Sequence, residues 1–84
     1  MGLKLRLAWY DRNTGQGEGE GVEFSQDFGD NVSVMDELVL SIDHDINNGE
    51  FDVVNEWLTI LQPLFMHPID LGLFDYQISF SYKN

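Results

Sequence analysis

The chain has 84 residues and no cysteine, so it contains no disulfide and no thiolate metal site. Its length predicts one small domain, residues 1–84, with a modest core, and its hydrophobic share of 43% is too large for a disordered acidic tail. Fifteen acidic and four basic residues give a net charge of −11, which argues against nucleic acid and anionic membranes as direct partners because so few cations can neutralise phosphate.

The basic residues stand near the two ends of the chain, and almost all the acidic residues lie between them. Two interpretations remain open: a surface that keeps the protein soluble, or an electrostatic field directed at a basic partner. The N-terminus alternates polar and apolar residues, unlike a signal peptide, and no apolar run approaches the roughly 20 residues of a membrane span. We therefore expect a cytoplasmic protein.

Both ends of the chain alternate with a period of two, which is typical of strands that bury one face. The apolar positions are Leu3, Leu5, Leu7 and Trp9 at the N-terminal end and Tyr76, Ile78, Phe80 and Tyr82 at the C-terminal end. The intervening positions are mostly polar or basic, so the sequence predicts two terminal strands with bases on their outward faces.

The middle of the chain predicts shorter elements. The glycine-rich residues 13–21 suit a hairpin loop, and residues 22–27 alternate as a second strand would. Ser33 precedes two acidic residues and resembles a helix N-cap, which predicts a short helix over about residues 34–39. Pro63 is expected to end whatever element precedes it.

The segment from Glu50 to Leu61 fits two structures. One helical face would carry Phe51, Val54, Leu58 and Leu61. One strand face would carry Phe51, Val53 and Trp57, with Glu50, Asp52 and Glu56 on the other. The frequent β-branched and aromatic residues, with the turn signal at Gly49, favour the strand.

Residues 43–52, DHDINNGEFD, look at first like a calcium-binding loop. An EF-hand loop needs glycine at its sixth position and glutamate at its twelfth, where this chain has Asn48 and Val54. Two distant histidines without cysteine argue against zinc. We expect no metal site and no cofactor, and we interpret this stretch as a turn that begins a strand.

Catalytic signatures are also missing from the sequence. It has no nucleophile elbow, P-loop or dinucleotide fingerprint, and its glycine-rich segment carries acids that would repel phosphate. We therefore expect no catalytic residue and no enzyme activity. The residues alone predict a small acidic α+β domain that binds something basic.

Five collinear segments resemble one family, and their order and spacing are kept from Met1 to Tyr82. The segments are MGLKLRLAWYD at the N-terminus, DFGDNVSVM, NNGEFDVVNEW, LQPLFMHPID and the final SFSY. Together they are similar to the cloacin-type immunity proteins, which protect a bacterium from its own ribosome-inactivating ribonuclease colicin. The glycine-rich segment departs most from the family.

This resemblance implies an α+β fold, a small antiparallel β-sheet of about four strands with one short α-helix on one face. It implies a bacteriocin immunity protein that binds and inhibits the basic, ribosomal-RNA-cleaving ribonuclease domain of its cognate toxin at an exosite beside the active site. The expected location is the cytoplasm of the producer cell, with release in complex with the toxin left open. A monomer and a weak homodimer both remain open.

The resemblance also implies a set of toxin-binding residues. The residue between NNG and FDV, here Glu50, is a main determinant of which toxin is recognised. Asp52 and Glu56 would share its outward strand face, and Gln77 and Arg6 stand where relatives carry an aromatic and an acid. The predicted toxin-binding residues are Glu50, Asp52, Tyr10, Glu56, Glu23, Glu20 and Gln77. Glu20 and Glu23 would act as rim charges that affect association rate more than affinity.

One alternative from a different class stays open. The chain would then be a generic acidic binding module, such as a nucleic-acid mimic for some other basic protein. Selective protection of a translation extract against one ribonuclease domain would distinguish the two.

Overall fold

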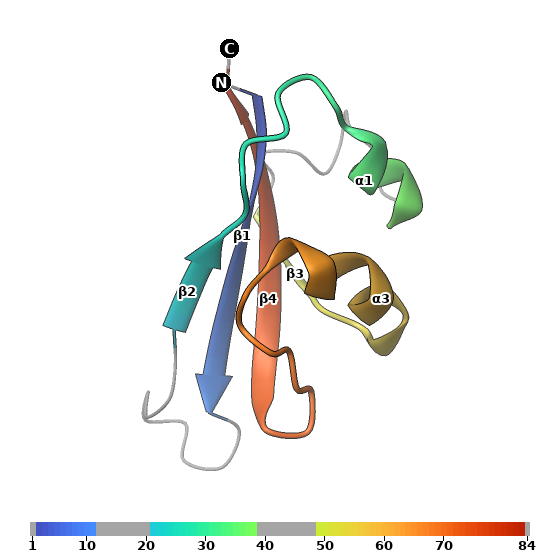
Figure 1. Ribbon diagram of the computed structural model, residues 1–84. Helices are drawn as coiled ribbons and strands as arrows, with labels where there is room; N and C mark the ends of the chain where they lie inside the picture. The colour runs from blue at the N-terminus through green and yellow to red at the C-terminus, as the bar shows by residue number, and fades with distance from the viewer. Residues whose placement is uncertain (1, 12–20, 39–48, 84) are drawn as a thin grey trace.

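The structure, a computed structural model, describes residues 2–11, 21–38 and 49–83 (Figure 1). Its strands form one antiparallel sheet in the order β2-β1-β4-β3, and short helices accompany it. The elements are β1 (Gly2–Asp11), β2 (Gly21–Phe24), α1 (Ser33–Glu37), β3 (Glu50–Asp52), η1 (Asn55–Trp57), α3 (Leu58–Leu61), η2 (Gln62–Leu64) and β4 (Phe74–Lys83). The predicted α+β fold is confirmed.

The two terminal strands are the long central strands of the sheet. β1 and β4 pair along ten residues, from Gly2 opposite Lys83 to Asp11 opposite Phe74. The alternation at both ends of the sequence predicted these strands, and the structure confirms them. Because they are neighbours, the two ends of the chain lie together (Figure 1).

One face of the sheet carries the hydrophobic core. Figure 1 shows α1 and α3 on the same side of the sheet. The odd-numbered residues of β1 and the even-numbered residues of β4 point to that side and pack with the helices. The largest fully buried side chains are Leu3, Leu5, Leu7, Met35, Leu61, Ile78 and Phe80. At roughly 25 cal/mol per Å² of apolar area removed from water, this contact is the main term that holds the helices on the sheet.

Helix α1 is confirmed, but its predicted cap is wrong. Ser33 is the first helical residue, and Val32 holds the cap position without a side-chain cap bond. Asn31 takes part instead: its Oδ1 accepts the Ser33 N–H at 3.1 Å. The sequence expectation failed because an Asx turn one residue earlier supplies the acceptor. The expected last residue of the helix, Val39, lies outside the described residues.

The segment from Glu50 to Leu61 divides between the two structures that its sequence allows. β3 occupies only Glu50–Asp52, after which Val53 turns into the core and donates its N–H to the Tyr76 carbonyl at 3.1 Å. The chain then forms η1 and α3, and α3 ends at Leu61. The prediction that Pro63 ends the preceding element is only partly right, because the helical turn η2 follows α3 directly and includes Pro63 near its start, where proline's missing N–H is tolerated. The prediction that Glu56 shares the strand face of Glu50 is therefore wrong, since Glu56 lies in η1.

Strand β2 is shorter than predicted. It ends at Phe24, and the chain then follows β1 irregularly, with the Phe28 N–H bonded to the Leu3 carbonyl. Ser25 holds the departure point: its N–H donates to the Leu5 carbonyl at 2.8 Å, and its buried Oγ accepts the Leu5 N–H at 2.9 Å. A side chain here replaces one rung of the ladder, which the alternation of residues 22–27 does not reveal.

Three described glycines have positive φ, and two of them, Gly49 and Gly2, stand at the starts of strands. Gly49 has φ of +88° directly before β3, which agrees with the predicted turn. Gly2 has φ of +138°, and a Cβ there would lie 2.3 Å from the Gly29 carbonyl oxygen. The close approach of these backbones brings residues 28 and 29 beside the start of β1, where the Leu3 N–H donates to the Gly29 carbonyl.

Candidate functional site

The second face of the sheet has no helix over it in the described part of the chain, and we call it the open face. It is formed by the even-numbered residues of β1 together with the residues beside them in the register. Its members are Lys4, Arg6, Ala8, Tyr10, Val22, Phe24, Glu50, Asp52, Asp75, Gln77, Ser79 and Ser81. Exposed sheet faces of this kind are suited to docking a partner, because their side chains are held by a rigid backbone.

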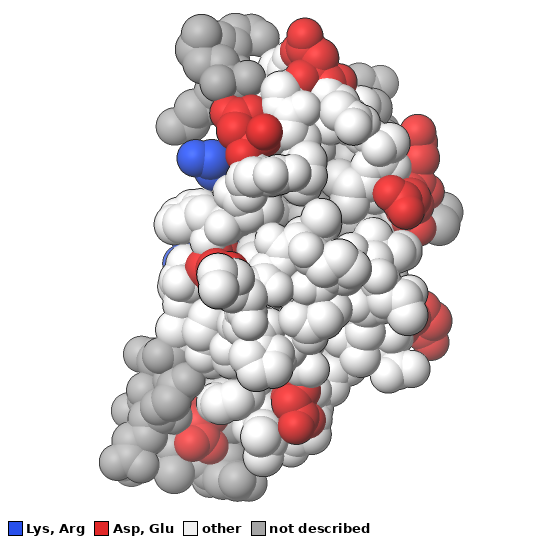
Figure 2. Space-filling view, viewed as in Figure 1, with Lys and Arg blue, Asp and Glu red and all other residues white. Residues whose placement is uncertain are grey.

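The distribution of charged side chains does not by itself identify the functional site. On the side seen in Figure 2, Asp and Glu side chains are spread over the surface, whereas Lys and Arg lie only along one edge. The acidic character is thus a property of much of the molecule. The open face is distinguished by the acidic, basic, aromatic and amide side chains that lie together on one uncovered side of the sheet.

Glu50 is paired within its own chain. Its Oε2 lies 3.3 Å from Nη1 of Arg6, and both residues flank Ser79 in the register. The two side chains are 38% and 39% exposed, so the contact is a surface ion pair of modest strength. Arg6, which the sequence analysis noted in a position where relatives carry an acid, therefore acts directly on the proposed specificity residue.

The next positions along the open face hold three more of the predicted residues. Gln77 lies between Asp52 and Ala8, and its Nε2 donates to Asp52 Oδ1 at 3.4 Å. Tyr10 is 41% exposed and stands opposite Asp75. The structure thus brings Glu50, Asp52, Gln77 and Tyr10 onto one face, although they come from three strands.

An open cleft of about 640 Å³ lies at the Tyr10 end of this face. Asp52, Asp75 and Gln77 contribute its polar lining, and Val53, Leu71 and Phe74 contribute apolar lining. It forms where β3 ends and the chain turns inward. No sequence pattern predicts this cleft, because its lining comes from four separated segments.

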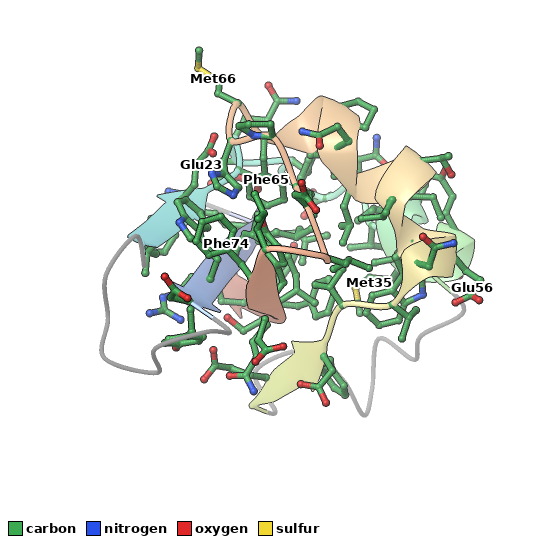
Figure 3. All side chains as sticks on the ribbon, turned by 90° about the horizontal axis from the view of Figure 1, so that it is seen from below. Glu23, Met35, Glu56, Phe65, Met66 and Phe74 are labelled. Carbon is green, nitrogen blue, oxygen red and sulfur yellow. The ribbon has the colours of Figure 1, made fainter. Side chains whose placement is uncertain are left out.

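The remaining predicted residues do not join this group. Glu23 points to the helical side, where its two carboxylate oxygens accept the N–H groups of Met66 at 2.8 Å and His67 at 2.9 Å. Figure 3 shows Glu23 beside Met66, while Glu56 lies far from it, beyond Met35. Glu20 lies outside the described residues. Glu23 therefore holds the loop after η2 against β2.

The loop held by Glu23 builds an aromatic group on the helical side. The His67 ring stacks on Trp9 with centroids 3.7 Å apart, and its Nε2 lies 2.7 Å from the Tyr76 hydroxyl. The same hydroxyl accepts the Asp70 N–H at 2.9 Å. Burial lowers the pKa of His67, because desolvation disfavours the imidazolium, while the charge of Glu23 acts in the opposite direction.

Two exposed apolar side chains are also present on the open face. Val22 and Phe24 in β2 are 46% and 59% exposed. The alternation of residues 22–27 predicts a strand, but it does not predict which face of the sheet these two side chains occupy. Their partners in the register, Ala8 and Arg6, belong to the open face, so the burial expected for a strand's apolar side does not occur.

The described residues contain no group of three or more His, Asp or Glu placed to hold a metal ion. The stretch 43–48, which was tested as a calcium loop, lies outside the described residues. Within the described part of the chain, no helix is long and apolar enough to cross a membrane.

A small α+β sheet with one covered face and one open face of charged and aromatic side chains suits a protein that acts by binding another macromolecule. Comparison with known families agrees. The Cloacin immunity protein family matches residues 2–83, so the chain belongs to this family. It is thus a bacteriocin immunity protein, which implies a cognate bacteriocin toxin as its partner.

Proposed function

We propose that this chain binds the basic, ribosomal-RNA-cleaving ribonuclease domain of its cognate bacteriocin through the open face and inhibits it without catalysis. One observation supports this most strongly. Tyr10, Glu50, Asp52 and Gln77 are far apart in sequence, yet they lie together on the one sheet face that no described helix covers. The docking position is an exosite beside the toxin's active site, as the family resemblance implies.

The charge of the two partners supports the same pairing. A ribonuclease domain that grips ribosomal RNA must be basic, and a protein of net charge −11 uses the same field in the opposite sense. Such steering raises the association rate and weakens as salt is added. The bound protein then keeps the toxin from the ribosome by its bulk and its negative charge, inside the producer cell.

The ion pair with Arg6 changes what Glu50 requires of its partner. A carboxylate buried alone in an interface costs several kcal/mol, and Arg6 already supplies a cation at 3.3 Å. Glu50 can therefore enter a contact without a dedicated toxin base opposite it. Asp52 and Asp75 lie farther along the same face.

The test is protection of a translating extract poisoned with candidate ribonuclease domains. Rescue from one domain and not from others would identify the cognate toxin. A double variant, Tyr10→Ala with Asp52→Asn, should lose this rescue, and Glu56→Gln is the control that removes one charge elsewhere. Equal rescue by all three proteins would contradict the open face. Binding to an unrelated basic protein without any rescue would favour the acidic-mimic alternative.

A further inference from the structure

Strand β2 forms one edge of the sheet, and no strand among the described residues lies on its outer side (Figure 1). An edge strand presents backbone N–H and C=O groups that can pair with an added strand, and natural edges are often protected by lysine or proline. The four residues of β2, GVEF, include neither. Only the shortness of the strand therefore limits what this edge can pair with.

The register shows which backbone groups of β2 point outward. The Ser25 N–H donates to the Leu5 carbonyl at 2.8 Å, so the odd-numbered residues of this segment direct their hydrogen bonds to β1. Because bonded and non-bonded pairs alternate in an antiparallel ladder, Val22 and Phe24 direct their N–H and C=O groups to the outer side. Within the described part of the chain, no hydrogen bond occupies these groups. The edge therefore offers two donors and two acceptors.

Apolar side chains flank this edge on both sides of the sheet. Val22 and Phe24 are about half exposed on the open face. On the helical side, Met66 is almost fully exposed, and the Glu23 carboxylate accepts its N–H at 2.8 Å (Figure 3). The side chains of an added strand would alternate between the two sides and cover apolar surface on each. Strand addition would therefore combine backbone hydrogen bonds with hydrophobic contact.

Charge determines which kind of strand suits this edge. Residues 18–30 carry five acidic side chains and no basic one, and the whole chain has a net charge of −11. A second copy would bring the same charge, and the register that uses both Val22 and Phe24 would place Glu23 opposite its own counterpart. A segment of a basic partner has the complementary charge. It would also extend the contact with the open face, to which Val22 and Phe24 belong.

We propose that the outer edge of β2 receives a short extended segment of the toxin's basic ribonuclease domain, which adds one strand to the sheet. The segment pairs through its backbone with Val22 and Phe24, and its alternate side chains cover Phe24 on one side and Met66 on the other. The inference rests on the proposed function and deepens it. Side chains of the open face select the toxin, whereas the edge adds backbone bonds that depend little on the toxin's sequence.

Amide hydrogen exchange tests the proposal, measured by NMR on the full chain with and without the ribonuclease domain that it inhibits. In the free protein, the Val22 and Phe24 amides should exchange quickly, whereas those of Glu23 and Ser25 are protected by β1. In the complex, exchange at Val22 and Phe24 should become at least about tenfold slower. Unchanged exchange at both positions in a tight complex would contradict strand addition and leave the proposed function intact.

Two substitutions at Val22 separate the backbone bond from the side-chain contact. Val22→Ala shortens the side chain and keeps the N–H, whereas Val22→Pro also removes the outward N–H, a change that edge strands tolerate. Val22→Pro should bind the ribonuclease domain at least about fivefold more weakly than Val22→Ala in calorimetry. Circular dichroism checks that both variants keep the fold. Equal affinities of the two folded variants would overturn the backbone pairing.

Two further outcomes separate this proposal from its alternatives. If no ribonuclease domain is bound and no translation extract is rescued, the proposed function fails and this inference fails with it. If the Val22 and Phe24 amides become protected without toxin as the protein concentration rises, the edge pairs with a second copy, and the toxin segment is the wrong occupant.

Discussion

The two faces of strand β1 have different roles, although they belong to one element. Leu3, Leu5 and Leu7 point toward the helices and are fully buried, whereas Lys4, Arg6 and Tyr10 alternate with them and remain accessible. The backbone and its hydrogen bonds are shared, so only the side chains differ. The covered face supplies the free energy of folding, and the open face can vary without loss of the fold. Under the proposed assignment of binding to the open face, specificity for different toxins can change there while the core stays constant.

The largest expected difference between the faces is in stability. Leu5→Ala should lower the free energy of unfolding by about 2–5 kcal/mol, because it leaves a cavity beside side chains that cannot fill it. Phe24→Ser, on the open face and 59% exposed, should change it by less than about 0.5 kcal/mol. Urea denaturation measures both. Similar losses in the two variants would mean that the open face also contributes to the core.

The next largest expected effect is a dependence of stability on pH, which arises from His67 on the helical side of the sheet. The pKa of His67 is lowered below its usual 6.5 in the folded protein by burial against Trp9, so the unfolded chain binds the proton more readily. Stability is therefore complete above about pH 6.5 and declines as the pH falls below that value. His67→Gln, which does not titrate, should show a smaller decline between about pH 7.5 and 5.5 in urea denaturation. Identical pH profiles would contradict this origin.

The smallest stability effect is expected from Arg6→Ala. Its ion pair with Glu50 is more than one third exposed, so removal should cost about 0–1 kcal/mol, and less at high salt. The effect on toxin binding should be larger than the effect on folding, since Glu50 would then enter the interface without its cation. Parallel denaturation and calorimetry of Arg6→Ala would show the split. A loss of stability without any change in affinity would place the pair in the fold alone.

The sequence predicted the covered face better than the open face. The alternation at both ends determined β1 and β4, because a period of two follows directly from strand geometry. It also placed Tyr10 and Gln77 on outward positions. The sequence did not predict the position of Glu56. Val53 fits the apolar face of a strand and Val54 fits the apolar face of a helix, so the pattern does not show where β3 ends and the helical turn begins. It failed at Ser33 because Asn31 makes the competing bond.

Interactions between distant segments were the part that could not be predicted. The Arg6–Glu50 pair depends on β4 standing between β1 and β3, and sequence order does not give that neighbourhood. Glu23 was expected among the rim charges. It lies opposite Leu7 in the register, so its side chain points to the helical side of the sheet, where its carboxylate accepts two backbone N–H groups. The cleft follows from the early end of β3, which no local pattern marks.

The most direct test of the account compares charge removal on the two sides of the molecule. The dissociation constant for the cognate ribonuclease domain should be measured for the wild type, for Tyr10→Ala with Asp52→Asn, and for Glu56→Gln. The open-face double variant should bind at least about tenfold more weakly, and Glu56→Gln should stay within about twofold of the wild type. A greater loss from Glu56→Gln than from the open-face variant would contradict the assignment of binding to the open face.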